Sequence, residues 1–386
     1  MDIQLNNLIE NSKDFGSGKS YRMLLLDMEK MYFIGDCCFR FNKIKYIENL
    51  VGKCDLTMVY TQSSNKWLYQ PLLKNNPFIK DVRHLNMEIV DFSPFDIIVL
   101  ISYDEQRFWN HLKKEFANLV PEIKIFSISK LALKKEDIIS NLFPEFPGLD
   151  KGMDELGPGD LYLDEMEIRM ADKWLLSQGL MPDESLFIFI DSSSTRQKVL
   201  PVKTYFELLD KILEISGIKV LIFDEKNLGK EKFYKEWIGP DKASKLIFSK
   251  GFSLRANLAL LGSSFTKFIF GPCTGLMHCA SSIYNNYVSK DPDYRIPFMV
   301  VYTGEPGKGN KNSDYWWGTS PLITCLLLMR KDKKKKIYIL DCIPKDKRNN
   351  LEKMACTEYT SPLLLDFLIE ALIERGLINP DLEKVL

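Results

Sequence analysis

A segment rich in hydroxyl and cationic side chains follows the apolar run 186–190. Residues 191–198 read DSSSTRQK, with Ser193 and Ser194 near the centre and Lys198 at the end. On a loop between a strand and a helix, such hydroxyls, backbone amides and cations suit phosphate oxygens. The spacing is neither that of a P-loop nor that of a GxGxxG dinucleotide fingerprint. The segment is therefore either a phosphate site of another kind or an ordinary solvated turn.

A second candidate begins where the apolar run 267–270 ends. Residues 271–280 read GPCTGLMHCA, which predicts that Thr274 and Gly275 start a helix and that His278 lies one turn further on the face of Thr274. Free amides at that helix start suit a diphosphate. The alternative is that His278 is a histidine of the protein core. Two nearby cysteines suggest zinc, but no second pair of ligands stands at a recognisable spacing, so we expect no metal site.

An acidic residue opens the first expected helix. Gly35 and Asp36 follow the apolar run 23–26, and the pattern predicts a helix over 36–51. Asp36 is then either an N-cap, for which Asp is a preferred residue, or a carboxylate at a ligand cleft that takes a proton from a substrate hydroxyl.

Two further charged segments favour simpler interpretations. The Asp-x-Asp spacing at 291–293 suits a divalent metal and a diphosphate, but its central proline and polar neighbours indicate a surface loop. The cluster KDKKKK at 331–336 is able to contact acidic phospholipid headgroups, yet a solvated turn between two strands is the simpler interpretation.

Strands and helices alternate along the chain and must position these residues. The hydrophobic pattern predicts strands at 23–26, 56–60, 96–101, 123–128, 186–190, 219–223, 246–248, 267–270 and 297–302. It predicts helices at 36–51, 67–73, 105–119, 163–178, 203–215 and 362–375, the last ended by Gly376. A stretch rich in proline, glycine and acids predicts a linker at about 131–162, between a domain at 1–150 and one at 163–386. We therefore expect two doubly wound α/β domains that face a cleft.

The composition excludes several classes of protein. The 386 residues include 52 Lys and Arg against 52 Asp and Glu, so no global field attracts a nucleic acid. The longest apolar stretch, 321–329, is far shorter than the roughly 20 residues of a membrane-spanning helix. The N-terminus lacks the pattern of a secretory signal, and the eight cysteines do not form a disulfide framework. We expect a cytoplasmic protein.

Together these segments resemble glycosyltransferase family nine, the bacterial heptosyltransferases of lipopolysaccharide biosynthesis. The resemblance runs in order through 24–26 (LLL) with 34–36 (IGD), 76–82 (NPFIKDV), 193–201 (SSTRQKVLP), 253–254 (SL) with 273–280 (CTGLMHCA), and 354–357 (MACT). The block at 273–280 is the most specific of these motifs.

The resemblance implies a GT-B fold, in which two Rossmann-like domains face a cleft, and inverting sugar transfer with no cofactor and no catalytic metal. The first domain would bind a saccharide, lipopolysaccharide-core or other glycan or glycolipid acceptor, with Asp36 as general base. The second would bind a nucleotide-diphospho-sugar, by analogy ADP-heptose. Its donor residues would be Ser193, Ser194, Lys198, Glu231, Thr274, Gly275 and His278. No nucleic acid is implied, and at most a peripheral contact with the inner membrane.

The chain also departs from the family pattern. Cys273 stands where the family has Asp, Leu200 replaces the usual Trp, and an extra loop spans 285–295. Glu231 matches the family's donor-ribose glutamate loosely, and Glu225 is its rival. A transferase for another nucleotide sugar and a non-catalytic nucleotide-sugar-binding protein are the alternatives.

Overall fold

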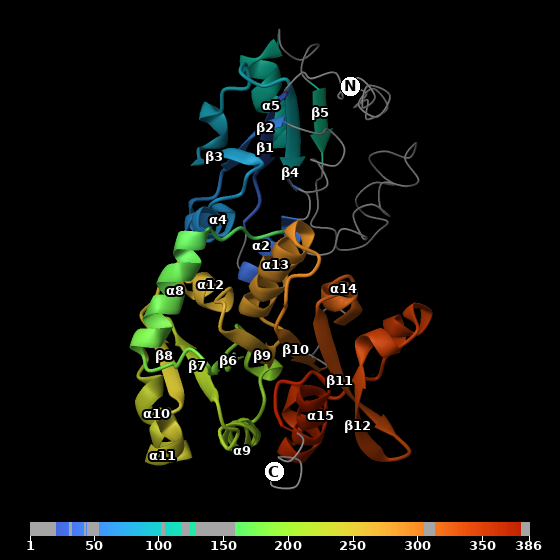
Figure 1. Ribbon diagram of the computed structural model, residues 1–386. Coiled ribbons are helices and arrows are strands. Elements are labelled where there is room, and N and C mark those ends of the chain that lie inside the picture. Colours follow the sequence, from blue (N-terminus) through green and yellow to red (C-terminus); the bar gives the residue numbers. More distant parts are fainter. Residues whose placement is uncertain are drawn as a thin grey trace. The chain divides into compact units, whose positions relative to one another are not determined.

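The chain divides into two compact units, Met1–Tyr162 and Leu163–Leu386. The computed structural model describes residues 21–30, 33–41, 44, 54–101, 105–117, 124–127, 159–304 and 313–379 (Figure 1). The second unit begins at the residue where the sequence pattern starts the second domain. Residues 131–158 of the predicted linker lie outside the described residues.

The first unit is built on a parallel sheet of five strands in the order β3-β2-β1-β4-β5. Its main elements are β1 (Tyr21–Asp27), α2 (Ile34–Arg40), β2 (Cys54–Tyr60), α4 (Lys66–Leu73), β3 (Ile79–His84), β4 (Ile97–Ile101), α5 (Glu105–Glu115) and β5 (Lys124–Ser127). Short 3-10 helices lie at η2 (Ser63–Asn65) and η3 (Met87–Ile89). Residues 23–26 of the central strand β1 are all apolar because both faces of the strand are buried there. Leu24 packs in a core with Ile98 and Phe108, while Leu25 is buried on the other face.

Two local predictions for this unit need correction. The sequence analysis missed strand β3 because the strand lies at the sheet edge, has no fully buried residue and is rich in charged side chains. Helix α2 begins at Ile34, so Asp36 is the third helical residue, and Phe33 occupies the N-cap without a side-chain cap. Asp36 is therefore not an N-cap. The predicted continuation of this helix through 45–51 lies outside the described residues.

The second unit has a sheet of seven strands in the order β8-β7-β6-β9-β10-β11-β12, in which only β12 is antiparallel to its neighbour. Its strands are β6 (Ser185–Phe189), β7 (Ile218–Asp224), β8 (Leu246–Lys250), β9 (Thr266–Pro272), β10 (Phe298–Thr303), β11 (Ile323–Lys331) and β12 (Lys334–Ile339). The six parallel strands follow the order of a dinucleotide-binding Rossmann sheet, 3-2-1-4-5-6.

Helices cover both faces of this second sheet (Figure 1). The α-helices are α8 (Glu165–Ser177), α9 (Val202–Ile212), α10 (Lys230–Ile238), α11 (Pro240–Ala243), α12 (Leu254–Leu261), α13 (Gly275–Lys290), α14 (Ser313–Trp317) and α15 (Ser361–Glu374). The 3-10 helices are η5 (Arg196–Lys198), η6 (Leu340–Cys342), η7 (Lys345–Asn350) and η8 (Cys356–Glu358). Helices α9 and α15 pack on one face, around Leu208 and Leu368. Strand residues such as Ile188 and Ile269, which lie outside that core, are equally buried, so the sheet is doubly wound as predicted.

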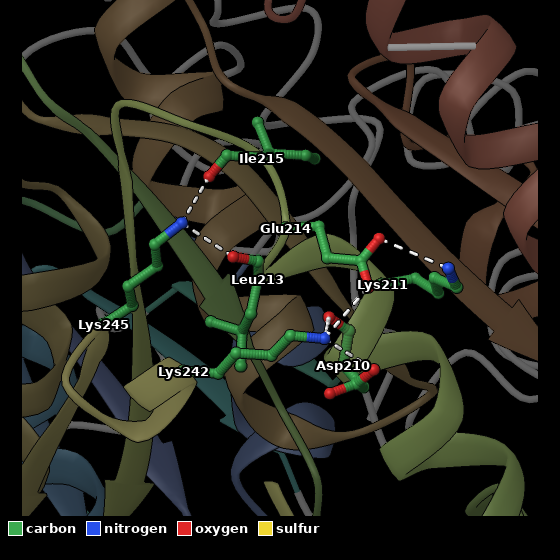
Figure 2. Close-up of polar contacts among 7 residues, drawn as sticks. All are labelled: Asp210, Lys211, Leu213, Glu214, Ile215, Lys242 and Lys245. Atoms are coloured by element: carbon green, nitrogen blue, oxygen red, sulfur yellow. Dashed lines mark hydrogen bonds and ion pairs between the residues drawn. The ribbon is translucent and has the colours of Figure 1, made fainter. Parts of the chain in front are cut away.

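Helix ends in this unit are closed by side chains as well as by backbone turns. Asp164 forms a capping box with Glu167 at the start of α8. At the end of α9, the Lys245 Nζ donates to the carbonyl oxygens of Leu213, at 2.7 Å, and Ile215, at 2.8 Å (Figure 2). Lys242 binds the Asp210 carboxylate at 2.8 Å beside them. A cation at a helix C-terminus also complements the helix dipole, so these lysines anchor the end of α9.

Candidate functional site

The strand order of the second sheet reverses between β6 and β9. In open α/β sheets, ligands bind beyond the carboxyl ends of the strands at such a point. The two strand ends approach closely here, because a Cβ on Gly271 would lie 2.7 Å from the Cβ of Ile190. Glycine is therefore required at this position. The predicted segments 191–198 and 271–280 follow these two strands and so flank the same point.

The loop after β6 is anchored at its first residue. Asp191 accepts from the Lys230 Nζ at 2.6 Å and from the Tyr234 hydroxyl at 2.7 Å, and both partners come from α10. The Asp191–Lys230 pair is largely buried, with side chains 14% and 17% exposed. Asp191 therefore holds the loop in place and has its charge matched within the protein.

The hydroxyl groups of this loop differ in exposure. Ser194 is exposed, whereas the Ser193 Oγ is buried and has no hydrogen-bond partner among the described residues. The loop ends in η5, which packs against η8, the segment that contains Cys356. A buried hydroxyl without a partner costs free energy, so Ser193 is suited to meet an added polar ligand.

Helix α13 starts at Gly275, as the sequence predicts. Thr274 occupies the N-cap position with an extended backbone, but its side chain makes no capping hydrogen bond. The first amides of a helix have no acceptor within it. Cys273, Thr274 and Gly275 are half-buried, so this helix start combines partial shielding with polar donors.

His278 lies one turn into α13 and is only 4% exposed. Its ring stacks on Trp317 of α14, with centroids 4.2 Å apart and planes 8° from parallel, and meets Trp316 edge-on at 5.6 Å. Burial, and secondarily the positive charge of Lys198, lower the pKa of His278 from its ordinary 6.5 to about 3. The imidazole is therefore neutral at physiological pH, and Lys198 lies within electrostatic range of it.

Lys198, like Arg196, is a basic residue of η5 at the end of this loop. Burial raises the pKa of the Cys356 thiol in η8 to about 12, and the positive charge of Lys198 acts in the opposite direction. Lys198, His278 and Cys356 come from three segments that are far apart in the sequence, 193–201, 273–280 and 354–357. The structure brings these segments together at the carboxyl edge of the sheet.

Glu231 is held differently from the other predicted donor residues. It lies in the first turn of α10, which follows β7, next to β6 in the sheet. Lys235 donates to its carboxylate at 2.6 Å, and Lys250 also pairs with it. These hydrogen bonds lower the pKa of Glu231. Its rival Glu225 is exposed on the turn before α10.

Asp36 belongs to the first unit. It is half-buried in the first turn of α2, the helix that follows β1, and the first sheet reverses its strand order between β1 and β4. The negative charge of an aspartate is favoured near a helix N-terminus.

The sequence analysis missed two groups of residues near these sites. Asp27, fully buried at the end of β1, accepts from the Tyr69 hydroxyl at 2.6 Å and from the amide of Glu29 at 2.9 Å. An acid that ends an apolar strand is a signal that could have identified it. Trp316 and Trp317 form a conspicuous pair in the sequence, but nothing there connects them with His278.

The described residues offer little support for a metal site. Nowhere in the described ranges do three His, Cys, Asp or Glu side chains lie close enough to hold an ion. The Asp-x-Asp segment forms a local turn, in which the Asp293 amide donates to the Asp291 carboxylate at 3.1 Å. Among the helices that the structure describes, none is long and apolar enough to cross a membrane.

Comparison with known proteins identifies the fold. No family model matches the sequence, and no curated protein matches it. Among solved structures, ADP-heptose lps heptosyltransferase II from E. coli superposes with a TM-score of 0.58 at 13% identity, over 92% of this chain and 99% of that one. The glycosyl transferase family 9 structure from Veillonella parvula DSM 2008 gives 0.59 at 14%, over 92% and 97%. The GT-B fold predicted from the sequence is confirmed, and the resemblance to family nine holds at the level of the fold.

Proposed function

We propose that this protein is an inverting glycosyltransferase that moves a sugar from a nucleotide-diphospho-sugar to a glycan or glycolipid acceptor. The observation that carries the proposal is the placement of Lys198, on the loop after β6, within electrostatic range of His278 in the first turns of α13. These residues belong to the two segments that resemble the donor motifs of family nine. The names of the two structures with the same fold, a heptosyltransferase and a family 9 glycosyl transferase, support the same reaction class.

In the proposed reaction the leaving group is the nucleotide diphosphate. As the glycosidic bond breaks, negative charge develops on the leaving phosphate oxygen, and Lys198 stabilises it together with the first amides of α13. Ser193, Ser194 and Thr274 supply hydroxyl contacts. His278 is neutral, so its contribution is a directed hydrogen bond and not a charge. This chemistry stabilises the leaving group without requiring a metal ion or cofactor.

The remaining residues complete the proposed site. Asp36, in the first turn of α2, acts as general base on the acceptor hydroxyl, as the family resemblance implies. Glu231 accepts hydrogen bonds from the donor ribose, which requires it to share its carboxylate with Lys235 and Lys250. By the same resemblance the donor is ADP-heptose, the acceptor is a lipopolysaccharide-core or other glycan, and the reaction is cytoplasmic.

A non-catalytic nucleotide-sugar-binding protein is the second candidate. It is favoured by one observation, the thiol of Cys273 at the end of β9, where the family has a carboxylate. In that case the donor site binds its ligand, but no sugar leaves the nucleotide.

Single-turnover transfer distinguishes the two candidates. A thermal-shift screen of ADP-, GDP- and UDP-sugars first identifies the donor, since a ligand that binds the native state raises its stability. Transfer is then compared between the wild type and Asp36→Asn at matched donor saturation. We expect Asp36→Asn to bind the donor normally and to transfer about 10²-fold or more slowly, the usual contribution of a positioned base.

Two results would contradict the proposal. Equal transfer rates would remove Asp36 from catalysis. The wild type is also tested with every donor that binds and with saccharide and glycolipid acceptors. If it transfers no sugar in any of these reactions, the result favours a non-catalytic nucleotide-sugar-binding protein.

A further inference from the structure

The hairpin formed by β11 and β12 carries an unusual concentration of positive charge. Residues 330–336, which we call the basic hairpin, read RKDKKKK and hold six cations and one carboxylate. All seven residues are exposed. The whole chain has no formal net charge, so this density is local and not a consequence of composition. We propose that the basic hairpin docks the protein on the surface of an anionic phospholipid bilayer.

The strand register places like charges directly opposite each other. Arg330 pairs with Lys335, and Lys331 pairs with Lys334. Like charges at directly opposed positions destabilise an antiparallel pair. A surface that supplies negative charge removes this repulsion.

The turn of the hairpin also carries a conformational cost. Asp332 and Lys333 adopt positive φ values of 51° and 65°, a conformation that favours asparagine or glycine at such two-residue turns. Lysine at the second turn position adds another exposed charge at the tip, where glycine would be the easier residue.

Three lysines on one face of the basic hairpin, which we call the outer face, are not neutralised by other residues that the structure describes. Because side chains alternate along a strand, Lys331, Lys334 and Lys336 share the face opposite to Lys335. The Nζ of Lys335 forms an ion pair with the carboxylate of Glu358 at 3.4 Å. Among the described residues no ion pair involves the three outer lysines; the Nζ of Lys336 lies 5.9 Å from the ring centre of Tyr338.

An edge strand often carries lysine merely to prevent pairing with other sheets, and β12 is such a strand. In this hairpin the charge is not confined to the edge strand, because it continues across the turn into Arg330 and Lys331 of β11. A single-stranded nucleic acid is a poorer fit than a bilayer, because such ligands typically stack on several aromatic side chains. Residues 330–336 contain none, and Tyr338, on the face of Lys336, is half-buried. A bilayer requires charge density alone, and clusters of four to eight Lys or Arg typically bind anionic lipid.

The test is sedimentation of the full chain with vesicles of phosphatidylcholine, with and without phosphatidylglycerol. We expect binding only to the anionic vesicles, and weaker binding as salt rises. Each basic residue near such a surface contributes about fivefold to partitioning, so Lys331→Gln/Lys334→Gln/Lys336→Gln should reduce binding about a hundredfold. The matched control, Lys173→Gln/Lys226→Gln/Lys232→Gln, removes three exposed lysines elsewhere and should bind as the wild type does.

Three outcomes would overturn the proposal. They are no binding of the wild type to anionic vesicles, equal losses in the hairpin and control variants, and binding of single-stranded RNA at low salt without binding of vesicles. Circular dichroism confirms that each variant is folded. Lys331→Glu/Lys334→Glu/Lys336→Glu is a second hairpin variant and should abolish vesicle binding, whereas retention of binding would also refute the proposal. The readout is independent of sugar transfer, so its result does not depend on the proposed function.

Discussion

The buried histidine of the candidate donor site should make the protein sensitive to mild acid. His278 is neutral in the folded protein because burial and Lys198 lower its pKa to about 3, whereas in the unfolded chain its pKa returns to the ordinary 6.5. Below pH 6.5 the unfolded state therefore binds a proton that the folded state does not bind. The free energy of unfolding falls as the pH falls from 6.5 towards 3.

The size of this effect follows from the two pKa values. A pH of 5 lies about 1.5 units below the pKa of the histidine in the unfolded chain, and each unit corresponds to about 1.36 kcal/mol. The free energy of unfolding therefore falls by about 2 kcal/mol between pH 7.5 and pH 5. For a unit of this size that loss lowers the Tm by about 4–8 °C. No discount for solvent screening applies, because the ring is only 4% exposed.

The assay is urea unfolding of the wild type and His278→Gln at both pH values, followed by circular dichroism. Glutamine does not titrate, and every other group titrates in both proteins, so the difference between their pH dependences isolates His278. We expect the wild type to lose about 2 kcal/mol more than the variant between pH 7.5 and pH 5. Equal losses would show that His278 is accessible to protons in the folded state and would refute its burial beside Lys198 and Trp317.

Two further substitutions test the packing around the site. Gly271→Ala places a Cβ 2.7 Å from the Cβ of Ile190 and should destabilise the second unit by about 1–3 kcal/mol in urea unfolding. An unchanged urea midpoint for this variant would contradict the close approach of β6 and β9. Lys245→Met removes the two hydrogen bonds at the end of α9 and should cost about 1 kcal/mol by the same assay, and an unchanged urea midpoint would show that these bonds do not stabilise the helix end.

The fold could be predicted from the sequence wherever burial is two-sided. Strands such as β1 and β6 are buried on both faces, so continuous apolar runs identified them. Strand β3 could not be identified in this way, because an edge strand needs few apolar residues and carries Lys80, Asp81 and Arg83. The start of α2 was misplaced by two residues because the helix has no polar N-cap to mark it.

The site could be predicted only in part, for a related reason. The sequence identified the segments of Lys198 and His278 separately, each after an apolar strand, but the strand order that places β6 next to β9 is seen only in the structure. Trp317 stacks on His278 from a helix that follows β10, and no periodicity or spacing relates the two positions. The role of Asp191 was also hidden, because its partners Lys230 and Tyr234 lie on the next helix.

Calorimetric titration of a nucleoside diphosphate tests the central claim most directly. The ligand is whichever of ADP, GDP and UDP binds the wild type most tightly, and it is titrated into the wild type, Lys198→Ala and the control Lys226→Ala, which removes an exposed lysine. If Lys198 makes a charge-assisted hydrogen bond to the diphosphate, Lys198→Ala weakens binding by about 10- to 150-fold, while Lys226→Ala binds as the wild type does. Equal affinities of the wild type and a folded Lys198→Ala variant, or no binding of any of the three ligands, would contradict a donor site at the ends of β6 and β9.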